Sequence, residues 1–444
     1  MQTTAVQPNQ ARHNFVPIAL IGLLFFIFGF ITWLNGALIP FLQIVCDLSQ
    51  TEALLIASSF YIAYTVMALP MAWILERTGY KNSISIGLVM VAAGFLLFIP
   101  AAETHSFLLF LLAQFVVGTS LTLLQTAANP YIVKIGPQET AAVRIFIMGL
   151  LNKGAGVLAP LFFAALVVGD LQHVTMASIN ALPEAERLAQ IDELANGLVI
   201  PYICGAVVWL LAAAFIKKSS LPELELEHDV SEDTGTELAA DKSSVLQFPH
   251  LILGAVTIFL YVGVEVIAGD TIGLFGSQLG VANATTLTSF TMGFMLFGYA
   301  LGLVLIPRLL SQQTALLWSA ALGVVISLLI VVSDPASTIV SEALWGWSGM
   351  QVLPDLVTFV AMFGFANAVV WPAVWPLALD GLGKLTPKGS ALLIMGISGG
   401  AIMPILFGVL SDHFGGQHGY LMMIPCYLFI LFYAAKGHKI KNWR

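Results

Sequence analysis

The run IFIMGLLNKGAGVLAPLFFAALVV, residues 145–168, is long enough to cross a membrane as one α-helix and carries a single charge, Lys153. A helix needs about 20 predominantly apolar residues to span roughly 30 Å of hydrocarbon. A lysine near the bilayer centre costs about 2.5–3.5 kcal/mol even on lenient insertion scales, so such a charge marks a functional site by default. The run therefore predicts a spanning helix whose charge needs an explanation.

The composition of the whole chain agrees with this reading. Of its 444 residues 58% are hydrophobic and 9% are charged, whereas soluble domains carry about 25% charged residues. The ~10-residue segments of alternating polarity that a β-barrel requires are missing from the sequence. We therefore predict an all-α membrane protein with twelve transmembrane helices. They are expected at about 16–42, 53–75, 82–101, 106–134, 141–169, 195–216, 248–274, 285–308, 313–333, 353–381, 388–412 and 418–436.

One polar, acidic stretch divides these helices into six and six. Residues 217–247 have the composition of a solvated linker, so we expect an N-terminal bundle at 1–216 and a C-terminal bundle at 248–444. The segment IMGLLNKGAGVLAP (147–160) is echoed by IMGISGGAIMP (394–404). This echo favours two pseudo-symmetric six-helix bundles, an arrangement in which transporters bind substrate near the midplane between the halves.

The basic residues predict the orientation. If the N-terminus is inside, all of the 17 Lys and Arg residues except Arg187 and Lys153 fall on the inner side. Short cytoplasmic loops hold such residues, so both termini are expected in the cytoplasm of a bacterial-type inner (plasma) membrane. The net charge of −8 lies in loops, and we expect the lipid bilayer and no nucleic acid as a partner.

No motif in the sequence indicates catalysis. GISGG (396–400) matches the G-x-S-x-G nucleophile pattern, but it lies within a hydrophobic span instead of a strand-to-helix turn. The sequence contains neither an H-E-x-x-H metal motif nor a Walker loop. We predict that the chain is not an enzyme and holds no cofactor or metal.

Five amide side chains fall inside predicted spans, where an unsatisfied amide costs several kcal/mol. An amide both donates and accepts, so a cavity lined by amides suits a neutral polyhydroxylated ligand better than an ion. The alternative is that they join helices to one another. The five candidate substrate-binding residues of this kind are Asn35, Gln125, Asn129, Asn152 and Asn367.

Aromatic residues supply further binding candidates. Trp371 and Trp375 lie four residues apart on one helix face, and each is followed by a proline. An indole offers an apolar plane for a sugar's C–H face and one N–H donor. Interfacial anchoring is the alternative for tryptophan. Tyr261 and Tyr299, on two other spans, are added as weaker candidates.

Two carboxylates join Lys153 as candidates for charge coupling. Glu265 lies within YVGVEVIAGD (261–270), and Asp270 lies near the outer end of the same span. Glu265 and Lys153 suggest a pair across the two halves that couples to a cation as the halves move. A static salt bridge is the alternative reading.

Four segments resemble the fucose/glucose-galactose porter group of the major facilitator superfamily. They are FFIFGFITWLNGALIPFLQ (25–43), LLQTAANPYIVKIGPQETAAVR (123–144), YVGVEV (261–266) and NAVVWPAVWPLALDGLGK (367–384). The resemblance implies a monomeric secondary transporter that imports a neutral sugar, a hexose such as glucose, galactose or fucose or an N-acetylated hexosamine, by alternating access.

The resemblance also implies protonatable residues that this chain lacks. Where proton-coupled fucose permeases carry acidic residues, the chain has Gly36 and Gln125. We therefore expect symport with a proton or sodium without deciding between them. Facilitated sugar uniport and drug efflux are the alternatives.

Overall fold

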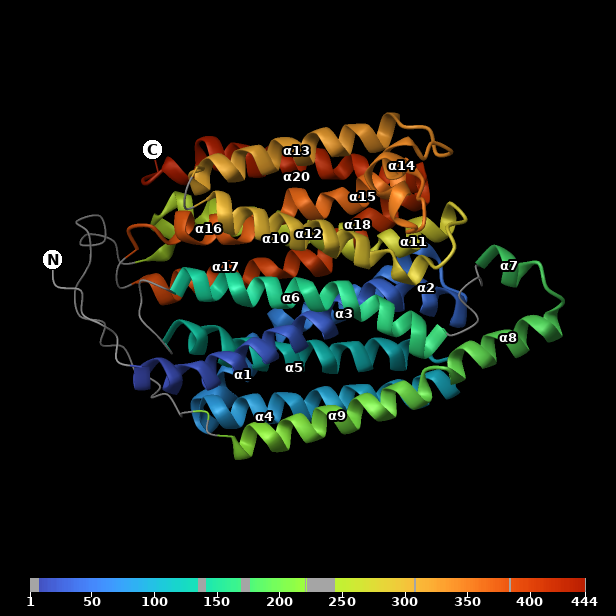
Figure 1. Ribbon diagram of the computed structural model, residues 1–444, viewed down its shortest axis with the longest axis horizontal. Coiled ribbons are helices and arrows are strands. Elements are labelled where there is room, and N and C mark those ends of the chain that lie inside the picture. Colours follow the sequence, from blue (N-terminus) through green and yellow to red (C-terminus); the bar gives the residue numbers. More distant parts are fainter. Residues whose placement is uncertain are drawn as a thin grey trace.

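The chain forms a bundle of helices that run between two ends of the molecule (Figure 1). This computed structural model describes residues 8–134, 141–168, 176–219, 221, 244–306, 309–382 and 385–443, and all regular elements in these ranges are helical. We call the end at which α1 begins and α20 finishes the terminal end, and the opposite end, which carries α7, α8 and α14, the distal end.

The first half of the chain supplies the lower group of helices in Figure 1. These are α1 (Pro8–Trp33), α2 (Asn35–Val45), α3 (Gln50–Val66), α4 (Ala68–Glu103), α5 (Phe107–Lys134), α6 (Ala141–Phe163), α7 (Met176–Asn180), α8 (Glu184–Asn196) and α9 (Val199–Lys218). A π-helical turn, Ala164–Val168, extends α6. We call this group the N-half.

The second half of the chain forms the upper group, which we call the C-half. Its helices are α10 (Pro249–Asp270), α11 (Ile272–Gln278), α12 (Thr288–Leu305), α13 (Gln312–Val332), α14 (Ile339–Trp345), α15 (Asp355–Asn367), α16 (Val370–Leu379), α17 (Thr386–Met395), α18 (Gly399–Phe414), α19 (Gly416–Gly419) and α20 (Met423–Ala435). Most of the predicted linker, residues 222–243, lies outside the described residues.

The prediction of an all-α protein with twelve crossings is confirmed. Eleven helices in the described ranges are long and apolar enough to span a membrane. The remaining crossing is α3, which continues into the first part of α4. The chain turns within α4 at Gly79, whose φ of 77° lies in the left-handed region that glycine adopts without strain. Gly79 thus separates the second crossing from the third.

Several crossings are interrupted along their length, among them the first, the seventh and the tenth. The first breaks between α1 and α2, the seventh between α10 and α11, and the tenth between α15 and α16. In the tenth, Pro372 has no N–H to offer the carbonyl of Ala368, so the helical ladder is interrupted there. In the first, Asn35 and Gly36 follow the break, and both residue types have low helix propensity. Interrupted helices expose backbone groups and allow close approach at these points.

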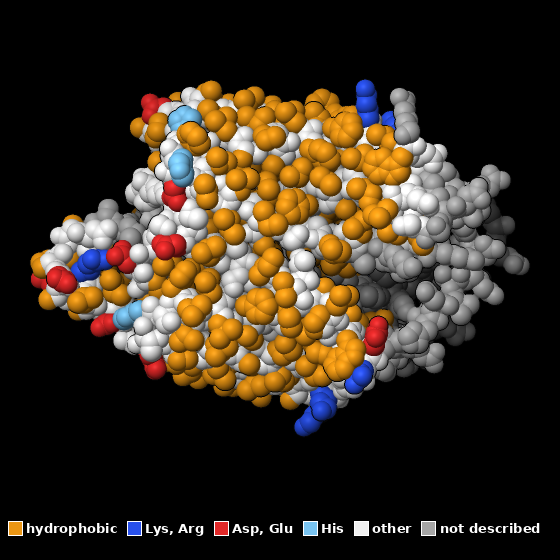
Figure 2. Space-filling view, turned by 180° about the vertical axis from the view of Figure 1, so that it is seen from behind, with side chains coloured by type: hydrophobic (Ala, Val, Ile, Leu, Met, Phe, Trp, Pro, Cys, Tyr) orange, Lys and Arg blue, Asp and Glu red, His pale blue; other side chains and the backbone are white. Residues whose placement is uncertain are grey.

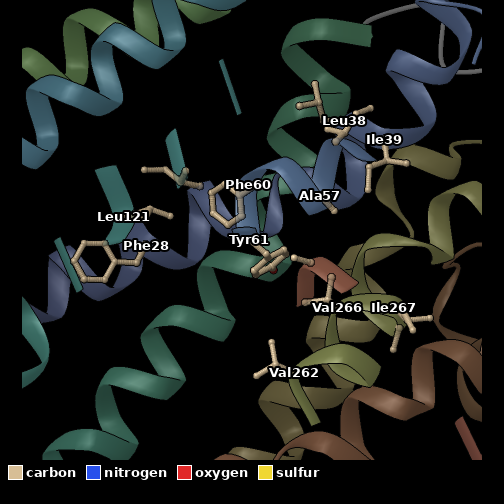
Figure 3. Packing of buried hydrophobic residues seen from close by; sticks show 14 of the residues in the cluster. Phe28, Leu38, Ile39, Ala57, Phe60, Tyr61, Leu121, Val262, Val266 and Ile267 are labelled. Carbon is tan, nitrogen blue, oxygen red and sulfur yellow. The ribbon is translucent and has the colours of Figure 1, made fainter. Parts of the chain in front are cut away.

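The two halves meet along two pairs of helices, α3 with α18 and α6 with α12. In Figure 3, Tyr61 of α3 lies near Val266 of α10 at this seam. Close approach depends on small residues, because a Cβ on Gly400 would lie 3.0 Å from the Tyr61 ring. Burial of these side chains sets the arrangement of the halves around the centre of the molecule.

The surface shows the pattern of a membrane protein. On the face shown in Figure 2, a broad apolar belt covers the molecule between its ends, Lys and Arg gather at the terminal end, and Asp, Glu and His predominate at the distal end. At the terminal end, the Lys441 ammonium donates a hydrogen bond to Asp380 Oδ2 at 2.7 Å and lowers the pKa of that carboxyl.

Candidate functional site

An ion pair joins the two halves at the centre of the molecule. Lys153 Nζ of α6 donates a hydrogen bond to Glu265 Oε1 of α10 at 2.7 Å. Each residue is 8% exposed. Removing one partner of such a pair leaves an uncompensated buried charge, which costs about 3–5 kcal/mol. The contact proposed from the sequence therefore forms in this conformation, and it links helices that belong to different halves.

Trp33 completes the surroundings of the lysine. Lys153 Nζ lies 4.4 Å from the centroid of the Trp33 ring at the end of α1, and this tryptophan is only 2% exposed. A cation over an indole face gains about 2 kcal/mol when it is desolvated. The ring also lies against Gly269, where a Cβ would be 2.6 Å from Trp33 Cζ3. Trp33 therefore places α1 between the lysine and the break in α10.

The C-half contributes three aromatic side chains on the terminal side of the ion pair. Tyr261 lies four residues before Glu265 on α10, and its ring centroid is 6.3 Å from that of Trp371 on α16. Trp371 and Trp375 have centroids 5.4 Å apart. Both tryptophans are partly exposed, whereas Tyr261 is buried. The structure brings these three candidates together as one aromatic surface.

The N-half contributes amide side chains on the terminal side of the ion pair as well. Gln125 Nε2 of α5 donates to the hydroxyl of Tyr64 at 2.8 Å, and Asn152 Nδ2 of α6 donates to the carbonyl of Phe25 at 3.3 Å. Gln125, Asn129 and Asn152 are all partly exposed. Since α5 runs from the distal to the terminal end, Gln125 and Asn129 lie on its terminal part. These amides retain capacity to bind a ligand.

Two other predicted binding residues make bonds inside their own bundles. Asn35 Oδ1 accepts a 2.7 Å hydrogen bond from Gln114 Nε2, and both residues line a small cavity within the N-half. Asn367 Oδ1 accepts a 2.9 Å hydrogen bond from the Tyr427 hydroxyl of α20. Asn35 is 2% exposed and Asn367 1%. In this conformation both amides connect helices within one half, which is the alternative role considered for them.

Asp270, the third candidate charge, lies beyond the ion pair toward the distal end. It is the last residue of α10 and is 0% exposed. Neither of its carboxylate oxygens has a hydrogen-bond partner among the described residues. The structure thus separates the two acidic candidates on α10: Glu265 is paired and Asp270 is not.

Sequence reasoning overlooked Trp33 and Tyr64, and it treated Tyr299 only as a weak binding candidate. Tyr299 of α12 is 5% exposed and lies against Gly149 of α6, where a Cβ would be 2.8 Å from the tyrosine ring. These spans are rich in apolar residues, so the presence of one more aromatic residue in the sequence does not indicate a role in binding. The position of Trp33 immediately before Asn35 in the TWLNG segment (32–36) was the available clue.

Hydrogen bonds between the halves close the distal end. The Thr51 hydroxyl at the start of α3 donates to Asp412 Oδ2 at the end of α18. Gln278 Nε2 of α11 donates to Gln50 Oε1 at 3.0 Å. We call this set of contacts, together with the packing of α2 against α10 and α11, the distal gate.

The comparisons with known proteins agree with the fold. A family model described as Major Facilitator Superfamily matches residues 21–398. The chain is 34% identical over 436 residues to a glucose/galactose transporter of Brucella abortus, covering 97% of this chain and 96% of the relative. The chain belongs to the major facilitator superfamily. It is accordingly a transporter and not an enzyme.

Other relatives and solved structures extend this result. The chain is 26% identical to an L-fucose-proton symporter of Escherichia coli, covering 96% of this chain and 94% of the relative. The crystal structure of the E. coli fucose:proton symporter matches with a TM-score of 0.67 at 23% identity, covering 95% of this chain and 98% of that one. A bacterial homologue of the lysosomal transporter Spinster, solved inward-facing, gives 0.62 at 15% identity, with 99% and 100% of the chains covered. These structural matches establish the shared fold.

Proposed function

We propose that this superfamily member imports a neutral sugar, a hexose or an N-acetylated hexosamine, by cation-coupled secondary transport. The observation that carries the proposal is the Lys153–Glu265 pair between the halves, with amides on one side and an aromatic surface on the other. Relatives of 34% and 26% identity bear the names of a glucose/galactose transporter and an L-fucose-proton symporter.

The sugar binds on the terminal side of the ion pair. Gln125, Asn129 and Asn152 exchange hydrogen bonds with its hydroxyl groups, since an amide can both donate and accept. Trp371 and Trp375 cover an apolar C–H face of the ring. Because the ligand is neutral, it needs no charged partner in the site. Lys153 and Glu265 therefore neutralise each other. The pair thus forms the distal floor of the site.

Transport follows from rocking of the N-half against the C-half around this site. The distal gate is closed in this conformation, so the site faces the terminal end. Opening the distal gate requires α3 to separate from α18 and α2 from α11. Lys153 and Glu265 sit on opposite halves, so their contact must lengthen or re-form during this motion. Sugar transport is coupled to a cation if binding of that cation changes the free energy of this step.

The orientation and the assembly are part of the proposal. The Lys and Arg residues at the terminal end favour a cytoplasmic location for that end in a bacterial inner membrane. The substrate site lies between the two halves of one chain, so a monomer is sufficient for transport. The conformation would then be inward-facing.

Counterflow in proteoliposomes tests the proposal. Vesicles loaded with unlabelled glucose, galactose, fucose or N-acetylglucosamine should accumulate the labelled form of the transported sugar transiently. Net uptake should depend on a proton or sodium gradient when the two are varied independently. Lys153→Met should reduce both activities at least tenfold, while Lys218→Met, at the exposed end of α9, should leave them unchanged.

Three results would contradict parts of this proposal. Exchange of none of the four sugars would reject the substrate class. Counterflow without any dependence of net uptake on either gradient would identify a uniporter. Export of an amphipathic compound in place of sugar exchange would identify the efflux alternative.

A further inference from the structure

Asp270 occupies an unusual position at the break between α10 and α11. It is 0% exposed, and both carboxylate oxygens are buried without a partner among the residues that the structure describes. Two hydroxyls on α12 are directed at the preceding carbonyls instead: Thr288 Oγ1 donates to Gly269 O at 2.7 Å, and Thr291 Oγ1 donates to Ala268 O at 3.1 Å. The two threonine hydroxyls therefore donate to the backbone beside Asp270 and not to its carboxyl.

Other buried carboxylates of the C-half are satisfied. Glu265 accepts from Lys153 Nζ at 2.7 Å. Asp355 is 4% exposed, yet it accepts from Val340 N at 2.8 Å and from the Ser337 hydroxyl. An ionised carboxylate buried without any partner costs several kcal/mol even after relaxation, so such a group is neutralised or paired. Asp270 in this conformation needs one further positive charge.

The distal gate covers the end of α10 that carries this carboxyl. Gly36 of α2 lies so close to α10 that a Cβ there would be 2.8 Å from Gly269 O. Beyond it, a Cβ on Gly273 of α11 would be 3.0 Å from Gly36 O and 3.1 Å from Pro40 Cγ. Because α2 belongs to the N-half and α10 and α11 to the C-half, opening the distal gate removes this cover. Asp270 then faces the distal side.

The charged and titratable groups around Asp270 leave it without a fixed counter-charge. Glu265 lies on the same helix and is neutralised by Lys153 of α6. Tyr61 on α3 interacts electrostatically with Asp270 and is neutral as a phenol. Tyr420 bonds to the hydroxyl of the next residue, Thr271, at 3.1 Å. None of these groups supplies a positive charge that belongs to Asp270 alone.

We propose that Asp270 is a proton-binding site of the transport cycle, and that the distal gate closes only after this carboxylate has taken up a proton from the distal side. This inference deepens the proposed function by assigning the coupling cation and the residue that carries it. A proton satisfies one oxygen without further ligands. A metal cation needs several oxygen ligands, whereas the hydroxyls of Thr288 and Thr291 beside Asp270 already donate to backbone carbonyls.

The sign of the pH dependence follows from this arrangement. With the gate closed, Asp270 holds its proton; with the gate open, the carboxyl contacts water and ionises. The closed state thus binds one more proton than the open state, so raising the pH favours opening. For one linked proton, the ratio of closed to open molecules falls about tenfold per pH unit once the open state is ionised.

Hydrogen–deuterium exchange of the full chain in nanodiscs tests this without any transported sugar, so its outcome is independent of the substrate assignment. After correction for the intrinsic exchange rate at each pH, amides of α2 and α11 should lose protection between pH 6 and pH 9. In Asp270→Asn, a neutral side chain of the same shape, protection should stay high across the range. Asp270→Ser provides a second neutral variant should the first fold poorly, and Asp270→Glu should keep the pH response.

Asp355→Asn is the matched control, because it neutralises a buried but hydrogen-bonded carboxylate of the same half and should respond to pH as the native chain does. The same pH response in Asp270→Asn or Asp270→Ser as in the native chain would overturn the proposal. A gate that responds to sodium at constant pH, and not to pH, would also overturn it and make the cation sodium.

Discussion

Lys153 can be understood only together with its contacts to Glu265 and Trp33. On its own it is a cation at an expensive depth; in the structure it donates to Glu265 at 2.7 Å and lies over the Trp33 ring. Desolvation of both charges offsets most of their attraction, so the pair adds little net stability compared with two apolar residues. The role of the pair is to connect the two halves. Single and double substitutions of the pair should therefore differ in their effects on stability and transport.

We expect Lys153→Met to destabilise the protein by about 3–5 kcal/mol, because Glu265 would stay buried without its counter-charge. Glu265→Gln should have a similar effect for the converse reason. The double variant should recover most of this loss in stability while failing to transport. Denaturant unfolding in one detergent, followed for all four proteins, measures the coupling. Additive losses in the double variant would show that the two side chains do not act as a pair.

Trp375 should contribute to sugar affinity through its indole plane. Replacing it by alanine removes a contact of about 1–2 kcal/mol, so we expect the half-saturating sugar concentration in counterflow to rise roughly tenfold. Trp318→Ala on α13 is the control, since this tryptophan is 66% exposed on the apolar belt. An equal effect of the two substitutions would indicate loss of membrane anchoring instead of loss of a binding surface.

At the scale of elements, the interrupted helices decide how closely the halves approach. The breaks after Trp33 and after Asp270 lie against each other across the seam, and Gly36 is the point of contact. The family resemblance places an acidic residue at position 36, where this chain has no side chain. The close approach of α2 to α10 is therefore available only to glycine.

Gly36→Val should open the distal gate. Any side chain at this position would collide with Thr288 Oγ1 and approach Gly269 O, both in the other half, so the closed arrangement is destabilised while the open one is not. Deuterium uptake by α11 should increase. Gly293→Val on α12 is the control, because a Cβ there has no atom within 4 Å. Unchanged protection of α11 in Gly36→Val would show that the gate tolerates the added volume.

At the scale of the whole molecule, the two ends differ in both charge and closure. Basic residues gather at the terminal end, and the contacts of the distal gate lie at the other end. Translocating a loop rich in Lys and Arg is unfavourable, so the terminal end is expected inside the cell. The amphipathic α8 and the loops beside it then extend outward.

A fluorescent reporter that matures only in the cytoplasm checks this orientation when fused after the last residue. We expect fluorescence from the C-terminal fusion and none from an insertion at residues 181–183, between α7 and α8. Arg187 lies in α8 and is the one basic side chain outside the membrane assigned to the distal side, so its replacement should not change the orientation. The reverse pattern of fluorescence would invert the proposed direction of transport.

The order of apolar runs by itself determined the helical class and the twelve crossings, because hydrophobic length is a local property of the chain. It also identified Lys153 and Glu265 as partners, since few charges lie within spans. Tertiary structure alone decided which amides face the central site. Asn35 and Asn152 have the same chemistry, but helix rotation directs Asn35 toward Gln114 within the N-half. Likewise, only the packed structure showed Asp270 to be buried without a partner among the described residues, because burial and pairing depend on segments far apart in the sequence.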